Sequence, residues 1–224
     1  MNRIKGPFII NLKNYTEISG QKAIEITKKA EKVAMDLDLR IIVSPPQVLL
    51  GLVASKTNLE ILGQHTDFEK IGASTGFVIP EMIKGAGGIG SIINHSEHPL
   101  NRTIIKKLIE RLKELDLISL VCAKNLEELK LISELQPDFV AIEPPELIGT
   151  KRSISSEKPS LIKESFEHLS STNSKTKLIC GAGINTSEDV RVALDLGSNG
   201  ILAASSIVKA DNWYNKIYEL AKPF

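Results

Sequence analysis

Short apolar runs recur along the chain and alternate with longer stretches in which apolar and charged residues mix. The apolar runs cover residues 8–12, 40–43, 59–63, 90–93, 118–122, 139–142, 178–180 and 201–204. Most of them are continuously apolar rather than alternating, which is typical of parallel strands covered on both faces. The pattern therefore predicts eight parallel strands.

The mixed stretches are amphipathic and predict helices. They cover residues 18–37, 47–55, 80–84, 101–115, 126–135, 159–169, 187–196 and 212–220. Strand followed by helix recurs about every 28 residues, which favours right-handed crossovers within one parallel sheet. Eight repeats fit a closed barrel better than an open sheet. We therefore expect an α/β fold, a closed (β/α)8 barrel, with residues 1–224 forming a single domain.

Composition and charge narrow the possible functions. The chain has 224 residues, 42% of them apolar and 25% charged, which suits one large globular core. Its 28 Lys and Arg nearly balance its 27 Asp and Glu, so no overall charge draws it to nucleic acid or to an anionic membrane. Aromatic residues make up only 4%, and no apolar stretch reaches the ~18 residues that span a bilayer. We expect neither nucleic acid nor a membrane as a partner.

The two cysteines, Cys122 and Cys180, both lie in predicted strands. Their apolar surroundings predict buried, inert thiols. Two isolated cysteines without a basic and apolar leader suit a reducing compartment, so we expect the protein in the cytoplasm.

Functional side chains of a parallel barrel gather where its strands end. Asn11 and Lys13 close the first strand and bring an amide and an ammonium group to the barrel mouth. Alone, such a lysine is usually just a solvated side chain. His95 follows the fourth strand, where a short helix starting at Ser96 and Glu97 would direct its amides at the ring. A positive helix end disfavours imidazolium, so we expect a neutral His95, the alternative being a purely structural histidine.

Glu143 ends the sixth strand, and a compact loop, residues 144–150, follows it. Two prolines stiffen the start of this loop, and Gly149 supplies a hinge near its end. Such a loop can act as a lid that excludes water from a carboxylate. The alternative is a chance acidic strand end followed by an ordinary loop.

The seventh and eighth strands are followed by CGAGINTSEDV and LAASSIVKA, two segments that lead into helices. Glycine lets backbone amides approach an anion, and a helix start favours negative charge. We therefore predict that Gly181, Gly183, Ala204 and Ser205 cradle a phosphate group. Many phosphate-binding barrels share this pattern.

Two further patterns predict no site. Residues 85–90 match G-x-G-x-x-G, but they follow a predicted helix and precede a strand, the reverse of a dinucleotide-binding turn. We expect an ordinary loop there. His65, His98 and His168 lack metal-ligand spacing with one another or with a cysteine, so we expect no metal.

Four segments together resemble the triose-phosphate isomerase family in its shorter archaeal form. They are INLKNY, NHSEH, AIEPPELIGT and CGAGINTSEDV, each at the end of a predicted strand, and the similarity spans nearly the whole chain. The resemblance implies interconversion of dihydroxyacetone phosphate and D-glyceraldehyde 3-phosphate through an enediolate, in glycolysis and gluconeogenesis. It also implies that the reaction needs no metal or organic cofactor.

The resemblance further implies roles for particular residues. Glu143 would be the catalytic base, His95 the electrophile, and Lys13 the cationic group beside the substrate. The remaining substrate contacts would come from Asn11, Ile148, Gly183, Ala204 and Ser205.

The family resemblance also implies a homo-oligomer, either a dimer or a tetramer, in which residues 68–77 contact a neighbouring subunit. The chain departs from the family pattern at three places, none of which removes a catalytic group. Lys151 and Arg152 replace a glycine and small or apolar residues. Ser206 replaces a glycine, and His98-Pro99 alters the stretch after the histidine motif.

Two other functions compete with this interpretation. Another phosphate-binding barrel, such as a biosynthetic enzyme for indole or thiazole compounds, would explain the C-terminal quarter equally well. It would not explain why Lys13, His95 and Glu143 occur together. A catalytically silent barrel that binds sugar phosphates as a sensor or scaffold is the alternative outside enzymes, and the intact catalytic groups argue against it.

Overall fold

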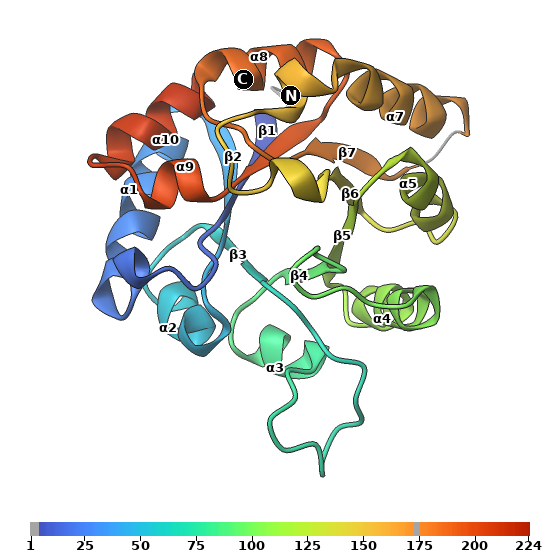
Figure 1. Cartoon of the computed structure of the whole chain (residues 1–224). Coiled ribbons are helices and arrows are strands. Elements are labelled where there is room, and N and C mark those ends of the chain that lie inside the picture. Colours follow the sequence, from blue (N-terminus) through green and yellow to red (C-terminus); the bar gives the residue numbers. More distant parts are fainter. Residues whose placement is uncertain (1–4, 173–174) are drawn as a thin grey trace.

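The computed structural model describes residues 5–172 and 175–224. Within these residues eight parallel strands close into a barrel in chain order (Figure 1). They are β1 (Lys5–Asn11), β2 (Leu39–Ser44), β3 (Glu60–Gly63), β4 (Gly90–Ile93), β5 (Ile118–Ala123), β6 (Phe139–Ile142), β7 (Lys177–Cys180) and β8 (Gly200–Ala203). The barrel closes because Phe8 of β1 pairs with Ile41 of β2 on one side and with Ile201 of β8 on the other. The predicted fold is confirmed.

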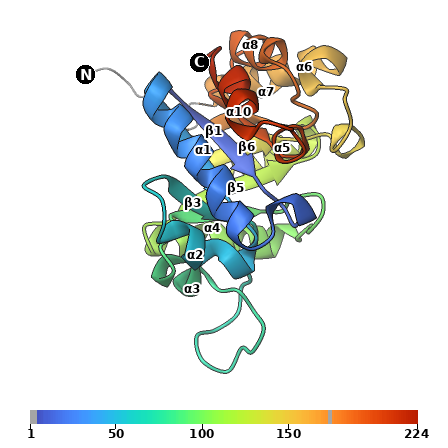
Figure 2. The same cartoon turned by 90° about the vertical axis from the view of Figure 1, so that its left-hand side faces the viewer.

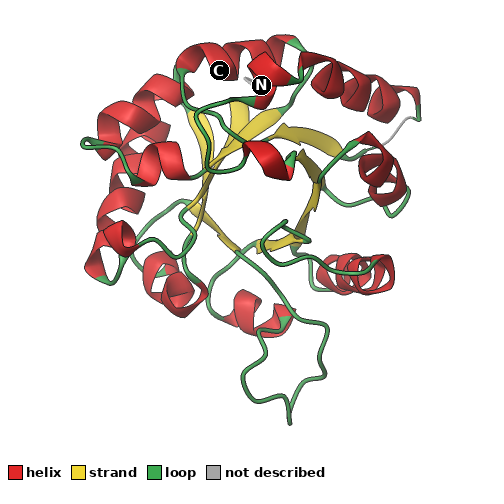
Figure 3. Cartoon of the chain, viewed as in Figure 1, coloured by secondary structure: helices red, strands yellow, loops and turns green. Residues whose placement is uncertain are grey.

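Helices surround the barrel (Figure 3). The α-helices are α1 (Gln21–Leu37), α2 (Leu50–Ala54), α3 (Pro80–Gly85), α4 (Arg102–Glu114), α5 (Leu126–Ser133), α6 (Ile154–Glu157), α7 (Pro159–Ser171), α8 (Ser187–Asp195), α9 (Ser205–Val208) and α10 (Trp213–Ala221). Three 3-10 turns, η1 (Thr16–Ile18), η2 (Gln47–Leu49) and η3 (Pro145–Leu147), complete the described elements. Throughout residues 5–172 and 175–224, every helix is too short or too polar to cross a membrane.

Two helices, α6 and α9, are absent from the predicted pattern. Each has only four residues, which is about one turn and too short to show an amphipathic period. The stretch predicted as one helix over residues 18–37 is also divided, because Gly20 takes a left-handed φ of 58° between η1 and α1. The glycine-rich residues 85–90 form the expected connection, in which Gly85 ends α3 and Gly90 begins β4.

The strands bury both faces, as their continuous apolar runs predict. Ile9 points into the barrel, where it packs with residues of the other strands such as Ile92 and Leu120. Its neighbours Phe8 and Ile10 point outward into the layer between the barrel and the helices. Burying each such side chain stabilises the fold by about 1.5–3 kcal/mol. This double burial leaves the strand ends as the place where polar residues can gather.

One loop departs from the compact outline. Residues 68–77 extend away from the barrel between β3 and α3, and we call them the protruding loop (Figures 1 and 2). Asp67 and Val78 close its base, since the Asp67 amide donates to the Val78 carbonyl at 2.7 Å and the Val78 amide donates to Asp67 Oδ2 at 2.8 Å. Ile71 and Phe77 on the loop are 65% and 50% exposed. The loop therefore presents apolar side chains to solvent on a fixed base.

Candidate active site

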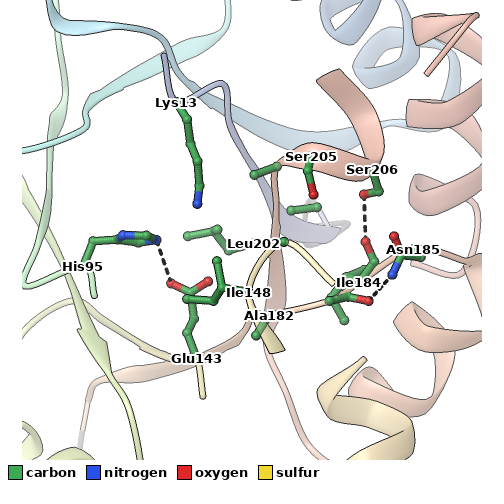
Figure 4. Close-up of a pocket in the computed structure, with 14 residues that line it drawn as sticks. Lys13, His95, Glu143, Ile148, Ala182, Ile184, Asn185, Leu202, Ser205 and Ser206 are labelled. Carbon is green, nitrogen blue, oxygen red and sulfur yellow. Dashed lines mark hydrogen bonds and ion pairs between the residues drawn. The ribbon is translucent and has the colours of Figure 1, made fainter. Parts of the chain in front are cut away.

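A cavity lies at the carboxyl ends of the strands. Lys13, His95 and Glu143 turn toward it from the segments that follow β1, β4 and β6 (Figure 4). The other predicted residues that line it are Ile148, Gly183, Ala204 and Ser205. Asn11 instead lines an adjoining hollow, which Lys13 and His95 also border. The fold thus brings together side chains that lie up to 192 residues apart in the chain.

Glu143 is almost completely buried, with 4% of its surface exposed. Its backbone amide donates to the carbonyl of Ala123, and its Oε2 accepts a hydrogen bond from Cys122 Sγ at 3.2 Å. Gly181 lies against the other side of the carboxylate, where an added Cβ would sit 2.5 Å from Oε1. Gly181, predicted in the phosphate cradle, does not line the cavity and instead leaves room for Glu143.

The thiol beside Glu143 stays protonated. Burial raises the pKa of Cys122 well above its usual value, and the nearby charge of Glu143 raises it further. Burial raises the pKa of Cys180 in the same way. Both cysteines are buried, as predicted. The hydrogen bond from Cys122 to Glu143 was not predicted, because the two residues belong to neighbouring strands and share no sequence signal.

The ring of His95 is held by hydrogen bonding at one nitrogen. The Glu97 amide donates to His95 Nδ1 at 3.1 Å. A ring nitrogen that accepts a hydrogen bond carries no proton, so the neutral ring has its proton on Nε2. Nε2 lies 3.9 Å from Oε2 of Glu143 (Figure 4). The ring and the carboxylate therefore face each other within the cavity.

The prediction of a short helix starting at Ser96 and Glu97 is wrong. Residues 96–97 form a turn, and α4 begins only at Arg102. Asn94 organises this turn, because its Oδ1 accepts from the Leu100 amide at 2.8 Å while its Nδ2 donates to a carbonyl of β5 at 3.0 Å. A single amide therefore reaches His95, rather than the end of a helix.

The Lys13 side chain approaches the cavity from the side opposite Glu143 (Figure 4). It has a left-handed φ of 49°, and its amide donates to Asn11 Oδ1 at 3.0 Å. Its ammonium group contacts Glu97 Oε1 at 2.6 Å. Because the Glu97 side chain is 57% exposed, this ion pair is weak and leaves Lys13 free to contact a bound anion. Glu97 was missed as a partner of Lys13, although it lies within the quoted histidine motif.

Two backbone segments form the far side of the cavity: the β7 loop, residues 181–185, and the β8 turn, residues 204–206. Gly183 has a φ of 68°, and a Cβ there would lie 1.9 Å from the carbonyl oxygen of Arg152. Ser205 begins α9, so the first amides of that helix point out of its end without an intrahelical partner. Ser206 Oγ donates to the Ile184 carbonyl at 2.7 Å and joins the two segments (Figure 4). The departure at Ser206 thus adds a cross-link.

The lid, residues 144–150, covers one edge of the cavity. Within the lid, the Leu147 side chain is buried, whereas Ile148 and Gly149 line the cavity. Gly149 has a φ of 72°, a left-handed conformation that glycine adopts without steric cost. Asn185 Nδ2 donates to Gly183 O at 2.6 Å and to Thr150 O at 3.4 Å. The lid therefore meets the β7 loop at its C-terminal end.

Among residues 5–172 and 175–224, no three His, Cys, Asp or Glu side chains are grouped so that they could hold a metal ion. His65 and His98 do meet, but their rings stack face to face with centroids 3.6 Å apart. Stacked rings direct their nitrogens sideways rather than at a shared ion.

Comparison with known proteins identifies the family. The family model described as triosephosphate isomerase matches residues 7–221. The chain belongs to the triosephosphate isomerase family. Its relatives include the triosephosphate isomerase of Cenarchaeum symbiosum, 46% identical over 96% of each chain, and that of Caldivirga maquilingensis, 44% identical over 96% of each chain. The resemblance to the archaeal form is confirmed.

A solved structure supports the fold of this family member independently. The triosephosphate isomerase of Bartonella henselae matches 98% of this chain and 100% of its own, with a TM-score of 0.74. Its identity to this chain is only 19%, so the likeness concerns the barrel and not the individual side chains.

Proposed function

We propose that this family member interconverts dihydroxyacetone phosphate and D-glyceraldehyde 3-phosphate with Glu143 as the base, His95 as the electrophile and Lys13 as the neighbouring cation. The observation that carries the proposal is the 3.9 Å separation of His95 Nε2 and Glu143 Oε2 across a buried cavity. A substrate bound beside these two groups presents its carbon to a proton acceptor and its oxygens to a proton donor. Neither a metal nor an organic cofactor takes part in the proposed steps.

Glu143 removes the carbon-bound proton in the first step. General base catalysis of this kind contributes roughly 10²- to 10⁴-fold to a rate. The carboxylate is kept in place by Cys122 on one oxygen and by close packing of Gly181 on the other. It returns the proton to the adjacent carbon, which completes the isomerisation.

His95 and Lys13 stabilise the enediolate that forms between the two proton transfers. His95 donates its Nε2 proton to one substrate oxygen and recovers a proton from the other. Lys13 offsets the negative charge of the enediolate and of the phosphate in a site with little water, where fixed charges act more strongly than in bulk solvent. Asn11 supports Lys13 through the hydrogen bond to its amide.

The phosphate group belongs at the far side of the cavity. Gly183, Ala204 and Ser205 offer backbone amides at a glycine turn and at a helix start, which are favourable positions for an anion. Closure of the lid brings Ile148 over the same place and keeps water from the enediolate.

We also propose that the protein works in the cytoplasm as a subunit of a homo-oligomer. The protruding loop exposes Ile71 and Phe77, and Met82 on α3, which follows the loop, is 58% exposed. Monomeric proteins seldom expose so many large apolar side chains in one region. We propose that the protruding loop contacts a second copy of the chain.

The decisive experiment measures isomerisation of glyceraldehyde 3-phosphate by purified protein in the presence of a chelator. Glu143→Gln should reduce the rate by roughly 10²- to 10⁴-fold, because the amide cannot accept the proton. Glu146→Gln, an exposed lid residue that pairs with Lys158, is the matched control and should keep nearly full activity. No turnover by the wild type would favour a sugar-phosphate sensor, and full activity in Glu143→Gln would show that the base is another residue.

A further inference from the structure

Asp189 joins two segments that border the cavity, although it lies outside the cavity itself. Its Oδ1 accepts a hydrogen bond from Ser153 Oγ at 2.6 Å. Its Oδ2 accepts from the amides of Asn185 and Thr186 at 3.0 Å and 2.9 Å. One carboxylate therefore binds the chain just beyond the lid to the end of the β7 loop.

The Ser153 side of this link is firmly buried. Ser153 is 2% exposed, and the following residue, Ile154, donates its amide to the Ala182 carbonyl at 3.2 Å. Ser155 Oγ also donates to the backbone carbonyl of Asp189 at 2.7 Å. The short helix α6 is thereby seated beside α8 (Figure 2). The C-terminal end of the lid has a fixed anchor even if the lid itself moves.

The Asn185 side of the link leads directly to the cavity. Asn185 Nδ2 contacts the carbonyls of Gly183 and Thr150, so the same residue touches the β7 loop and the lid. Lys216 of α10 holds the Asn185 carbonyl at 2.8 Å. A shift of Asp189 would therefore move the lid anchor relative to Gly183.

The carboxylate is ionised at neutral pH. Burial opposes its ionisation, but hydrogen bonds from Ser153, Asn185 and Thr186 outweigh burial and lower the pKa of Asp189. Hydrogen bonds to an ionised acceptor are stronger than those between neutral groups. The link is consequently well suited to hold two loops at a constant separation.

A helix cap alone does not account for this arrangement. Asp189 and Thr186 form a capping box at the start of α8, which uses the Thr186 hydroxyl and Asp189 Oδ2. Oδ1 takes no part in the box and instead contacts Ser153, 36 residues earlier in the chain. That second contact is the one that connects the helix to the lid.

We propose that Asp189, acting through Ser153, is a positioning residue that sets the closing lid against the phosphate-binding β7 loop. The proposal rests on the proposed isomerase function and goes beyond it. A loosened anchor lets the enediolate escape before it is reprotonated. The carbon–oxygen bond to phosphate then breaks, the enediolate electrons form the new carbon–carbon double bond, and inorganic phosphate leaves with the bonding pair. The remaining enol takes up a proton at carbon and becomes methylglyoxal.

Asp189→Ala and Ser153→Ala test this role together. Each should raise KM for glyceraldehyde 3-phosphate by roughly fivefold and increase the phosphate released per turnover by a similar factor. The value of kcat should change less, because Glu143 and His95 are untouched. Asp189→Asn should keep KM and phosphate release close to the wild-type values. Its amide oxygen can accept from the backbone amides while its NH2 group donates to Ser153.

Thr186→Ala is the matched control. It removes the capping-box hydroxyl and lowers thermal stability, but it keeps the contact between Asp189 and Ser153. It should therefore keep the wild-type KM and phosphate release. Equal KM and equal phosphate release in Thr186→Ala, Ser153→Ala and Asp189→Ala would overturn the proposal and leave Asp189 with a structural role only.

A second measurement separates this proposal from the proposed function. Titration with inorganic phosphate, followed by calorimetry, needs no turnover and should show weaker binding in Asp189→Ala and Ser153→Ala than in Thr186→Ala. If the wild type binds phosphate but does not isomerise, the catalytic assignment fails while the positioning role is still decided by these affinities. Equal phosphate affinity in all variants, together with unchanged phosphate release, would refute the positioning role.

Discussion

The two sides of the cavity are built in different ways. On the phosphate side, the β7 loop and β8 turn use backbone held by glycine, by Ser206 and by the lid anchor. On the open side, formed by residues 11–15, 64–67 and 95–98, side chains make the contacts, and the Lys13–Glu97 ion pair is partly exposed. The cavity that the phosphate side shares with Lys13, His95 and Glu143 has a volume of about 30 Å³, and the adjoining hollow of the open side has a volume of about 590 Å³.

This difference indicates that a single chain forms the whole phosphate side of the site. The phosphate side is closed by segments of the same chain, so its geometry is set once the barrel folds. The open side leaves polar groups around a wide hollow beside an exposed apolar loop. Changes in sequence should therefore be tolerated less well on the phosphate side, and the open side should respond more to assembly and to pH.

The largest effect is expected from Gly183→Ala on the phosphate side. The added methyl group would lie 1.9 Å from the Arg152 carbonyl oxygen, and the φ of 68° is unfavourable for alanine. Because a displacement of about 1 Å at a reacting site can cost roughly 100-fold, we expect kcat/KM to fall by about that factor. Gly72→Ala is the control, since its φ of 111° is also unfavourable for alanine but nothing lies within 4 Å of the new methyl group. Similar losses in both variants would argue against a pre-built phosphate side.

A smaller effect is expected when the protruding loop loses its apolar side chains. Ile71→Ser combined with Phe77→Ser should weaken subunit association by roughly 10- to 100-fold, because each side chain is already partly buried and would contribute only about 0.75–1.5 kcal/mol more at an interface. Sedimentation across a range of protein concentrations measures this change. Met35→Ser, an equally exposed apolar residue on α1, is the control and should leave assembly unchanged. Association that is insensitive to the loop would place the interface elsewhere.

The two sides also differ in how far the sequence predicts them. Apolar runs fix the strands, and the strand ends then bring Lys13, His95 and Glu143 to one rim, because parallel strands all end on the same side. The turn after His95 was wrongly predicted as a helix, since the Asn94 side chain accepts from the Leu100 amide and is itself held by the Cys122 carbonyl of β5, a contact that no local pattern encodes. The pairs Cys122–Glu143 and Ser153–Asp189 depend on strand register and on loop packing, which no local sequence pattern encodes.

The smallest predicted effect concerns pH on the open side. Burial and the adjacent His98 ring lower the pKa of His65, although Asp67 opposes this shift. The folded state therefore favours neutral His65, and the stability that it contributes is lost as the pH falls below about 6.5, where the unfolded chain takes up the proton first. Asp189 on the phosphate side behaves differently. Because its pKa is lowered in the folded state, the stability that it contributes is kept at neutral pH and is lost only as the pH falls below its ordinary pKa of 3.8.

Residue-specific NMR titration between pH 7.5 and pH 5 distinguishes the two sides. His98→Asn should raise the pKa of His65, because it removes one of the causes that lower it and leaves burial in place. The same substitution should flatten the decline in thermal stability over this pH range. His168→Asn, on α7 and remote from the stacked pair, is the control. An unchanged His65 titration in His98→Asn would mean that burial and Asp67 together set the pKa, and that the stacked ring adds no pH sensitivity to the open side.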